Sequence, residues 1–310
     1  MTRLSTVRIA TRASRLALWQ SEHVAALLRA AHPGVEIELL PMTTTGDRIT
    51  DRALAAIGGK GLFIKELEVA MQEGTADLAV HSMKDVPAGL PDGFALGAIL
   101  EREDPRDVLV AAAPCSVAEL ASGARVGTSS LRRRSQLLAL RPDLEVLDLR
   151  GNVPTRLARL AEGAYDAIVL AAAGLKRLAL FDERCTLLEP ESFLPAVGQG
   201  AIGIEIRAGD KDVAALVGVL HHQPTADCVA AERAMNERLG GSCHAPVAGF
   251  AQLGPDLLSL EGLAASVDGA DVVRQTARGP AADAAGIGER LADSMLRAGA
   301  DSILERVNKG

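Results

Sequence analysis

The segment ARVGTSSLRRRSQL, residues 124–137, runs from a short apolar stretch through a threonine and serine turn into a basic, helix-like pattern. An earlier segment, VRIATRASRLALWQ at 7–20, has the same order of parts. A second pair of segments is also alike, EGTADLAVHSMKDV at 73–86 and EGAYDAIVLAAAGL at 162–175. These two pairs of similar segments predict two similar lobes in which a strand is followed by a helix.

Short apolar runs alternate with helical patterns along most of the chain, which is typical of an α/β protein with largely parallel sheets. The candidate strands are residues 7–12, 35–42, 76–82, 107–112, 124–129, 145–151, 166–174 and 201–207. After about residue 225 the pattern becomes a helix, three strand-like stretches and an amphipathic helix from about 283 to 298. That change predicts a further domain with an antiparallel sheet.

The composition favours a multidomain cytosolic protein and argues against nucleic-acid-binding and membrane-spanning proteins. A chain of 310 residues is longer than one hydrophobic core usually serves. A net charge of −7 and 2% aromatic residues argue against a nucleic-acid partner, because single-strand binders need stacking platforms. The chain has no apolar run long enough for a membrane span, and MTRLSTVRIATR lacks the apolar stretch of a signal peptide, so we expect a cytosolic protein.

The cysteines show neither the pairing of a disulfide framework nor the spacing of a zinc site, so we expect no metal. They are Cys115, Cys185, Cys228 and Cys243. Cys243, in GGSCHAP, differs from the others because two glycines allow its loop to approach a cleft closely. Its thiolate could be a nucleophile, although a free cysteine is more commonly a small buried hydrophobe.

Three adjacent cations, Arg132, Arg133 and Arg134, stand at the expected first turn of a helix. Backbone dipoles already place roughly half a positive charge at a helix N-terminus, so arginines are normally disfavoured there. An anion bound at the helix start would resolve the conflict, held by free N–H groups, guanidinium forks and nearby hydroxyls. Those hydroxyls belong to Thr128, Ser129 and Ser130.

More basic residues are expected at strand ends or in adjoining turns of the two lobes. They are Arg12, Lys84, Arg150 and Arg156, with Lys60 in a glycine-containing segment, 43–63, that suits a mobile lid. Each could be ordinary surface charge, but together they favour a cleft that binds carboxylates or phosphates. GGKGLF at 58–63 lacks the upstream glycine of a phosphate loop, which argues against a nucleoside triphosphate.

Asp85, in HSMKDVP, follows an apolar strand directly. A carboxylate beside several cations stays ionised near neutral pH and suits the stabilisation of a developing positive charge. A turn-capping role paired with Lys84 is equally open on the sequence alone.

A series of motifs stands in order along almost the whole chain: ATRxSxLALWQ, GGKGLFxKELE, DxAVHSMKDVP, EREDPRD, GTSSLRR, LRGNVxTRL, AGLKRL, LPAVGQGAxGIE and ERAMNxRL, followed by a glycine-rich cysteine loop. On these motifs the chain resembles the porphobilinogen deaminases, the hydroxymethylbilane synthases of tetrapyrrole and heme synthesis. The resemblance implies a transferase that condenses four porphobilinogens head to tail on a covalent dipyrromethane primer. Hydroxymethylbilane is then released by hydrolysis, with loss of four ammonia.

The resemblance also assigns roles by position. Cys243 would carry the dipyrromethane, and catalytic Asp85 would bind pyrrole N–H groups, stabilise the azafulvenium formed as ammonia leaves and assist proton transfer. Substrate and cofactor carboxylates would meet Arg12, Ser14, Ser82, Lys84, Thr128, Ser129, Ser130, Arg132, Arg133, Arg150, Gly151, Arg156, Arg177 and Gln199. Lys60 and Phe63 match the lid. Arg15 and Arg134 have no assigned role, and the GSC loop with His244 departs from the common GGC form.

The implied fold has three α/β domains: residues 1–102 with 198–219, residues 103–197, and residues 220–310. The first two would be lobes like those of periplasmic binding proteins, with mixed, mainly parallel sheets. The third would carry the cofactor and an antiparallel sheet. The resemblance further implies a cytoplasmic monomer whose partner is porphobilinogen, and the carboxylates of that substrate supply the anion that the arginines would bind.

Two other classes share parts of this pattern. A solute-binding protein would have the two lobes and a basic cleft, but it normally carries an export signal and needs no reactive cysteine. A pyridoxal-phosphate enzyme could use Lys84 as its Schiff base, and its absorbance would distinguish it from a dipyrromethane enzyme.

Overall fold

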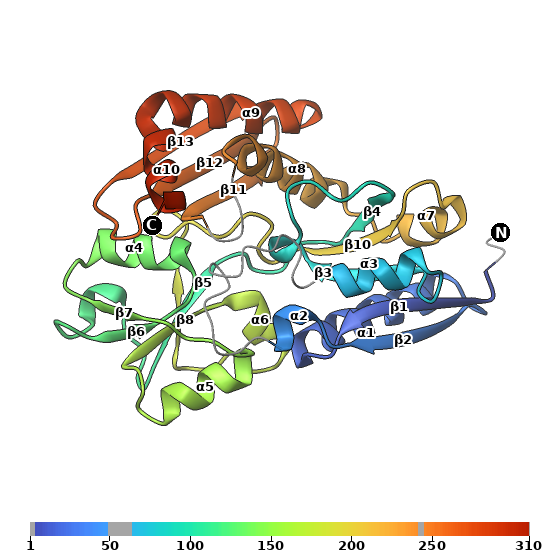
Figure 1. Ribbon diagram of the computed structural model, residues 1–310, viewed down its shortest axis with the longest axis horizontal. Helices are drawn as coiled ribbons and strands as arrows, with labels where there is room; N and C mark the ends of the chain where they lie inside the picture. Colours follow the sequence, from blue (N-terminus) through green and yellow to red (C-terminus); the bar gives the residue numbers. More distant parts are fainter. Residues whose placement is uncertain (1–3, 49–63, 241–244, 310) are drawn as a thin grey trace. The chain divides into compact units, whose positions relative to one another are not determined.

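The computed structural model describes residues 4–48, 64–240 and 245–309 (Figure 1). The chain forms two compact units, Met1–Glu103 with Ala201–Ala226, and Asp104–Gly200 with Asp227–Gly310. Within the described ranges, no helix is both long and apolar enough to cross a membrane. The division into three domains stays a prediction.

The first unit is built on a five-stranded sheet of order β2-β1-β3-β10-β4. Its strands are β1 (Thr6–Arg12), β2 (Glu36–Met42), β3 (Leu78–Ser82), β4 (Phe94–Ile99) and β10 (Ile202–Arg207). β1 pairs in parallel with β2 and β3, whereas β10 runs antiparallel to β3 and β4. The three parallel strands therefore end at one edge of the sheet.

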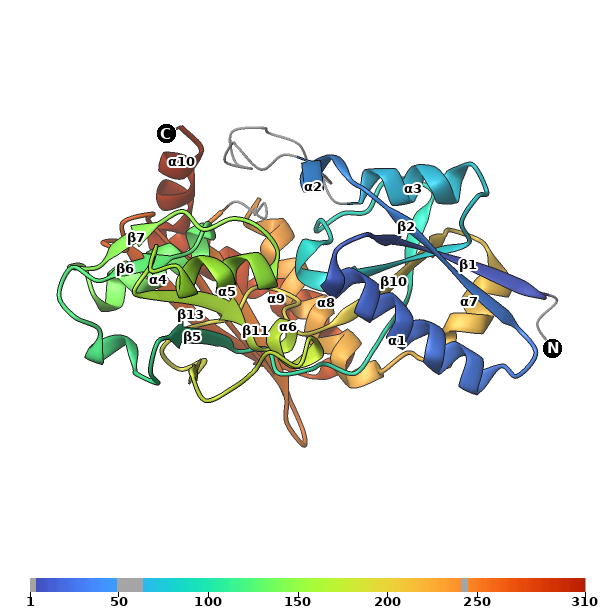
Figure 2. The same ribbon diagram turned by 90° about the horizontal axis from the view of Figure 1, so that it is seen from below.

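Helices cover both faces of this sheet (Figure 2). They are α1 (Arg15–Ala31) and α7 (Lys211–Gly218) on one face and α3 (Lys65–Gln72) on the other, with a short α2 (Thr45–Arg48) after β2. The alternation of side chains along β3 serves both faces, because Leu78 and Val80 pack with α1 and α7 while Ala79 packs with α3. Burial on both faces explains why the strand is almost wholly apolar.

The second unit contains a sheet of order β7-β6-β8-β5-β9. Its strands are β5 (Asp107–Ala111), β6 (Arg125–Gly127), β7 (Glu145–Leu147), β8 (Ala167–Ala171) and β9 (Cys185–Leu188), and its helices are α4 (Leu131–Leu140), α5 (Val153–Ala161) and α6 (Ala172–Arg177). β6 pairs in parallel with β7 and β8, and β5 runs antiparallel to β8 and β9. The two sheets therefore share one topology. The similar sequence segments 7–20 and 124–137 form equivalent strand-and-helix pairs, β1-α1 and β6-α4.

The antiparallel strand of each sheet lies next to a crossing between the two sheets. β5 is the first strand after β4, and β10 is the first strand after β9. Each enters the fourth position of its sheet. The segment Ile202–Arg207 thus returns to the first sheet after the whole second sheet has formed.

A three-stranded antiparallel sheet, β11-β12-β13, completes the second unit. Its elements are β11 (Val247–Leu253), β12 (Leu258–Ala265), β13 (Val272–Gly279), α8 (Gln223–Arg238), α9 (Ala284–Met295) and α10 (Asp301–Lys309). A Cβ at Gly262 of β12 would lie 2.5 Å from Met235 Sδ and 2.8 Å from Met295 Sδ, so only glycine allows α8 and α9 this close to the sheet. The predicted α/β class, the mixed sheets and the C-terminal antiparallel sheet are confirmed.

Two edge strands were not predicted. β4 contains Gly97, a residue that normally interrupts a strand pattern, but a Cβ there would lie 2.8 Å from Val217 Cγ2 of α7. β9 has only four residues, too few for its alternation to be recognised.

Candidate active site

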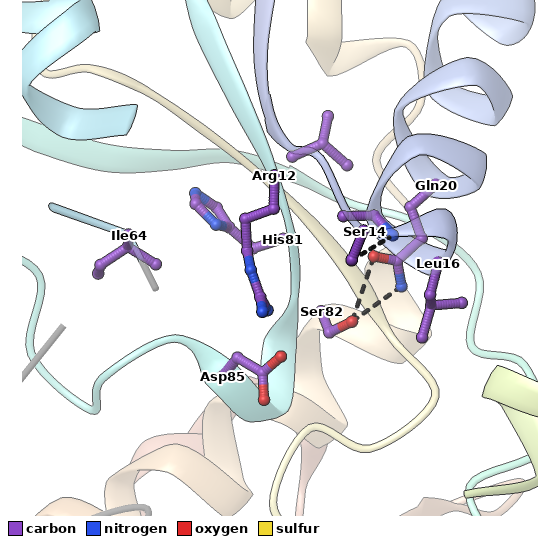
Figure 3. A pocket seen from close by; sticks show the side chains of 10 residues that line it. Arg12, Ser14, Leu16, Gln20, Ile64, His81, Ser82 and Asp85 are labelled. Atoms are coloured by element: carbon purple, nitrogen blue, oxygen red, sulfur yellow. Dashed lines mark hydrogen bonds between the residues drawn. The ribbon is translucent and has the colours of Figure 1, made fainter. Parts of the chain in front are cut away.

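A pocket with about 390 Å³ of empty space, part of it open to solvent, lies in the first unit where β1 and β3 end (Figure 3). Its polar lining comes from Arg12, Ser14, Gln20, His81, Ser82 and Asp85. Four of these were predicted site residues: Arg12, Ser14, Ser82 and Asp85. The carboxyl edge of parallel strands is where open α/β sheets bind ligands.

Parallel pairing brings these side chains together from distant parts of the sequence. Arg12 is the last residue of β1 and Ser82 the last of β3. Ser14 caps α1, and its Oγ accepts a hydrogen bond from the backbone N–H of Ala17 at 3.4 Å. The strand, the hydroxyl turn and the helix thus follow one another as the sequence predicted.

Ser82 is held by a buried glutamine. Nε2 of Gln20 donates to Ser82 Oγ at 2.8 Å, and Gln20 Oε1 lies 3.2 Å from the same oxygen. Gln20 is 2% exposed and lies on the buried face of α1. Sequence reasoning missed it, although a glutamine among the core positions of an amphipathic helix indicates a buried polar partner.

Asp85 lies on a one-turn 3₁₀ helix, η2 (Met83–Asp85), that follows β3 directly. Met83 is 1% exposed and anchors the turn in the core. In Figure 3 the side chain of Arg12 extends toward the carboxylate of Asp85. Lys84 belongs to the same turn but is not among the residues that line the pocket.

The second unit holds a buried cluster around Asp107, the first residue of β5. Arg132 Nη1 donates to Asp107 Oδ2 at 2.7 Å, while Nε and Nη2 of Arg133 donate to Oδ1 at 3.0 and 2.7 Å. Gln199 Nε2 donates to the same Oδ1 at 3.1 Å. Burial raises the pKa of Asp107, but the two guanidinium charges outweigh it and hold that pKa well below its usual range.

The carboxylate of Asp107 is therefore an internal anion at the start of α4. Arg132 and Arg133 are each 5% exposed and also donate to backbone carbonyls, those of Leu194 and Val169. Two cations against one carboxylate leave a positive charge in excess, so the cluster can still attract an external carboxylate. That ligand role stays a prediction. Asp107 was missed, although an aspartate that opens an apolar strand indicates a buried charged partner.

The hydroxyl turn before α4 repeats the one before α1. Ser130 caps α4, and its Oγ accepts from the backbone N–H of Arg133 at 3.4 Å, as Ser14 does in the first unit. Thr128 Oγ1 accepts from the backbone N–H of Ser130 at 3.2 Å. Ser129 Oγ donates to the Leu149 carbonyl at 3.0 Å.

The remaining predicted residues of the second unit follow the carboxyl ends of β7 and β8. Arg150 and Gly151 come after β7, and Gly151 has a φ of +103° that favours glycine. The Gly151 carbonyl accepts from Arg156 Nε at 2.7 Å. Arg177, at the end of α6, donates from Nη2 to the Gly200 carbonyl at 2.7 Å.

Three predicted residues, Cys243, Lys60 and Phe63, lie outside the described residues. The other cysteines have settings unlike that of a reactive thiol. Burial raises the pKa of Cys115 and Cys185, and Cys228 packs in the core between α8 and the antiparallel sheet. A raised pKa lowers the fraction of nucleophilic thiolate.

Two family models match the chain. Residues 7–215 match "Porphobilinogen deaminase, dipyromethane cofactor binding domain", and residues 226–297 match "Porphobilinogen deaminase, C-terminal domain". A porphobilinogen deaminase of Stenotrophomonas maltophilia (strain K279a) is 57% identical over 301 residues, covering 97% of this chain and 99% of that protein. The protein of that name from strain R551-3 is 56% identical over the same shares.

Similar solved structures include two solute-binding proteins. The probable amino-acid ABC transporter extracellular-binding protein of Bacillus subtilis has a TM-score of 0.45 at 10% identity, over 70% of this chain and 91% of that chain. The periplasmic aliphatic sulphonate binding protein of Escherichia coli has a TM-score of 0.42 at 16% identity, over 75% of this chain and 70% of that chain.

Proposed function

The chain belongs to the porphobilinogen deaminase family, and we propose that two groups of its side chains, one in each compact unit, divide the family's reaction between them. This transferase reaction joins four molecules of porphobilinogen head to tail on a dipyrromethane cofactor. It releases ammonia at each addition and yields hydroxymethylbilane. Neither the solute-binding nor the pyridoxal-phosphate alternative accounts for this family membership.

The pocket of the first unit would bind the reacting pyrrole. Its main support is that Arg12, Ser14, Ser82 and Asp85 meet at one sheet edge. Asp85 would accept hydrogen bonds from pyrrole N–H and offset the positive charge that develops as ammonia leaves. Arg12 and the serine hydroxyls would bind the acetate and propionate groups, because guanidinium and hydroxyl donors suit carboxylates.

The residues present fit a dipyrromethane. That group offers carboxylates and pyrrole N–H groups, and the pocket offers cationic and hydroxyl donors beside one carboxylate acceptor. Cys243 would hold it through a thioether, and the bound group supplies the primer for elongation. Lys60 and Phe63 would form a lid over the site, a role carried only by the family resemblance.

The second unit would hold further carboxylates. Arg132 and Arg133 keep one positive charge in excess of Asp107, and Arg150, Arg156 and Arg177 follow strand ends of the same sheet. Thr128, Ser129, Ser130, Gly151 and Gln199 would complete this binding surface. Lys84, in the first unit, would also bind carboxylates of the substrate or cofactor. Each added pyrrole brings two carboxylates, which accounts for an arginine-rich site in an acidic protein.

Purified protein incubated with porphobilinogen tests the function. We expect ammonia and a bilane that cyclises without further enzyme to uroporphyrinogen I. Asp85→Asn keeps the shape of the side chain but loses its charge, so turnover should fall by about 10²–10⁴-fold, as for the loss of a group that stabilises charge or moves a proton in the transition state. Near-normal turnover in a variant shown by mass to carry its cofactor would remove Asp85 from this role.

Mass spectrometry of the denatured protein tests the attachment residue. We expect one adduct of two pyrrole units on the peptide that contains Cys243, growing by equal steps when porphobilinogen is limiting. Cys243→Ser should lose the adduct and most activity. Cys115→Ser, Cys185→Ser and Cys228→Ser should keep both, and an adduct mapped to any of these three would overturn the assignment.

Three finer points also remain proposals: division into domains 1–102 with 198–219, 103–197 and 220–310; a monomeric state; and a cytoplasmic location. The return of β10 to the first sheet and the separate antiparallel sheet support the first. Sedimentation of the purified protein tests the second, since a dimer would sediment with twice the mass of 32.3 kDa.

A further inference from the structure

A buried histidine and glutamate stand behind the pocket. His81, on β3, lines the pocket, and its Nε2 lies 2.8 Å from Oε2 of Glu205 on β10. Their side chains are 4% and 1% exposed. Within the described ranges the imidazole makes no other hydrogen bond, so its second ring nitrogen, Nδ1, has no partner there.

The topology of the sheet places these residues together. In the antiparallel pairing of β3 with β10, Glu205 is opposite Ala79, two positions before His81. Side chains alternate along a strand, so Ala79, His81 and Glu205 share the face that α3 covers. Their carboxylate and imidazole are thus kept from bulk water by a helix.

A second carboxylate, Glu68 of α3, lies on the same face and is 9% exposed. Burial raises the pKa of Glu68, and the charge of Glu205 raises it further, although His81 lowers it. Oε1 of Glu68 and Oε1 of Glu205 are buried without a hydrogen-bond partner in the described structure. A neutral Glu68 would leave Glu205 as the charged partner of His81.

An ionised carboxylate accepts hydrogen bonds but cannot donate one, so an ionised Glu205 would hold the imidazole proton on Nε2. Nδ1 then carries a lone pair, and any positive charge that forms on the ring is paired with Glu205. The same division of labour between a carboxylate and an imidazole makes histidine a general base in hydrolases. The charged groups around this ring are Arg12 and Asp85 in the pocket, and Glu205 and Glu68 behind it.

We propose that His81 is a further catalytic residue, the base that accepts through Nδ1 the proton released by each condensation, and that Glu205 is its positioning residue. The inference rests on the proposed function of the pocket as the place where porphobilinogen reacts. It separates two tasks, leaving Asp85 to stabilise positive charge while His81 removes the proton.

The C–N bond of the aminomethyl group breaks, and the protonated amine leaves with the electron pair as ammonia. The freed carbon forms a C–C bond to the unsubstituted α-carbon of a second pyrrole, whose C–H bond then breaks and returns its electrons to the ring. The proton goes to Nδ1 of His81 and passes from there, before the next addition, to water that enters through the open part of the pocket.

A spectroscopic test needs no turnover. In protein labelled with ¹⁵N-histidine, with the His81 signals assigned through the backbone of β3, we expect the neutral ring to carry its proton on Nε2 and none on Nδ1. Glu205→Gln should weaken this preference. A neutral ring protonated on Nδ1 in the unmodified protein would overturn the proposal, because Nδ1 could not then accept a proton.

A kinetic test uses porphobilinogen deuterated at its free α-carbon. His81→Gln should lower kcat by about 10²–10⁴-fold, the usual effect of losing a general base, and should enlarge the deuterium isotope effect relative to the unmodified enzyme. Glu205→Gln should lower kcat with little change in KM. His32→Gln is the matched control, because His32 bonds the Leu216 carbonyl at 2.9 Å outside the pocket, and it should change neither quantity.

The outcomes separate this inference from the function on which it rests. A slow Asp85→Asn enzyme together with an unchanged isotope effect in His81→Gln overturns the role of His81 alone. Near-normal turnover in both variants overturns the proposed function of the pocket. If His81→Gln fails to fold, the tautomer measured in the unmodified protein still decides the proposal.

Discussion

Asp107 shows how one buried carboxylate organises the start of a helix. Asp107 is fully buried, and its carboxylate accepts hydrogen bonds from two guanidinium groups and one side-chain amide. Its negative charge is therefore paired entirely within the second unit. A buried ion pair adds little net stability, but removal of one partner leaves an uncompensated charge. The cluster therefore makes the fold sensitive to this one residue.

Asp107→Asn should destabilise the protein by about 3–5 kcal/mol, because two arginines stay buried without their counter-charge. Urea unfolding followed by circular dichroism would measure the loss. Asp166→Asn is the control, since Asp166 pairs with Arg125 where both side chains are 40% or more exposed, and it should cost at most about 1 kcal/mol. Equal losses in the two variants would contradict the importance of burial.

The three adjacent arginines should differ in their effects. Arg132→Leu and Arg133→Leu each remove a bond to Asp107 and part of the positive excess, so they should impair cofactor loading or elongation. Arg134 is half-buried and has no counterpart in the family motif, so Arg134→Leu should be much milder. Cofactor content by mass and turnover would measure both. An Arg134 variant more impaired than the other two would refute this ranking.

At the scale of elements, β10 supports the turn that carries Asp85. Gly203 of β10 faces Met83 of η2, and a Cβ at Gly203 would lie 2.2 Å from Met83 Sδ. Met83 is buried, so it has little room to move aside. A strand that joins the first sheet late in the sequence thus fixes the position of a residue at the end of β3.

Gly203→Ala should displace Met83 and the turn behind it. We expect a loss of about 1–3 kcal/mol in stability, typical of overpacking, and a fall in turnover because Asp85 shifts. Gly218→Ala is the control, because nothing lies within 4 Å of a Cβ there, and it should leave turnover unchanged. Thermal unfolding and a porphobilinogen assay measure the two effects, and full activity in Gly203→Ala would argue against this support.

At the scale of the whole molecule, stability should fall in acid. The pKa of Asp107 is held low by Arg132 and Arg133 against the effect of burial, and that of Asp104 is held low by Arg106 and Lys176 in the same way. A depressed folded-state pKa stabilises the protein above the unfolded carboxyl pKa of about 4, and this stabilisation is lost as pH falls below it.

Urea unfolding measured from about pH 6 down to about pH 3 should therefore show nearly constant stability down to about pH 5 and an increasing loss below it. The slope should be smaller in Asp107→Asn, which lacks one of the two carboxyls. An identical slope in the variant would show that Asp107 does not contribute to the acid sensitivity.

The sequence by itself determined the class of fold and the order of its elements apart from the edge strands β4 and β9. All eight candidate strands of the two lobes are present within a few residues, because each has an apolar run that a buried strand requires. The repeated segments also predicted two similar lobes, and the structure adds that their sheets share one strand order. The local sequence pattern was enough to predict these elements, because the periodicity of a strand or a helix depends on residues that are close together in the sequence.

Only the tertiary structure decided which side chains meet. The pairing of β1 with β3 joins Arg12 to Ser82 and Asp85, and the pairing of β3 with β10 joins His81 to Glu205. Asp107 meets Arg132 and Arg133 because β5 enters the second sheet beside β8. Such contacts depend on strand order and register, which hydrogen bonds between distant segments fix and which no local sequence pattern records.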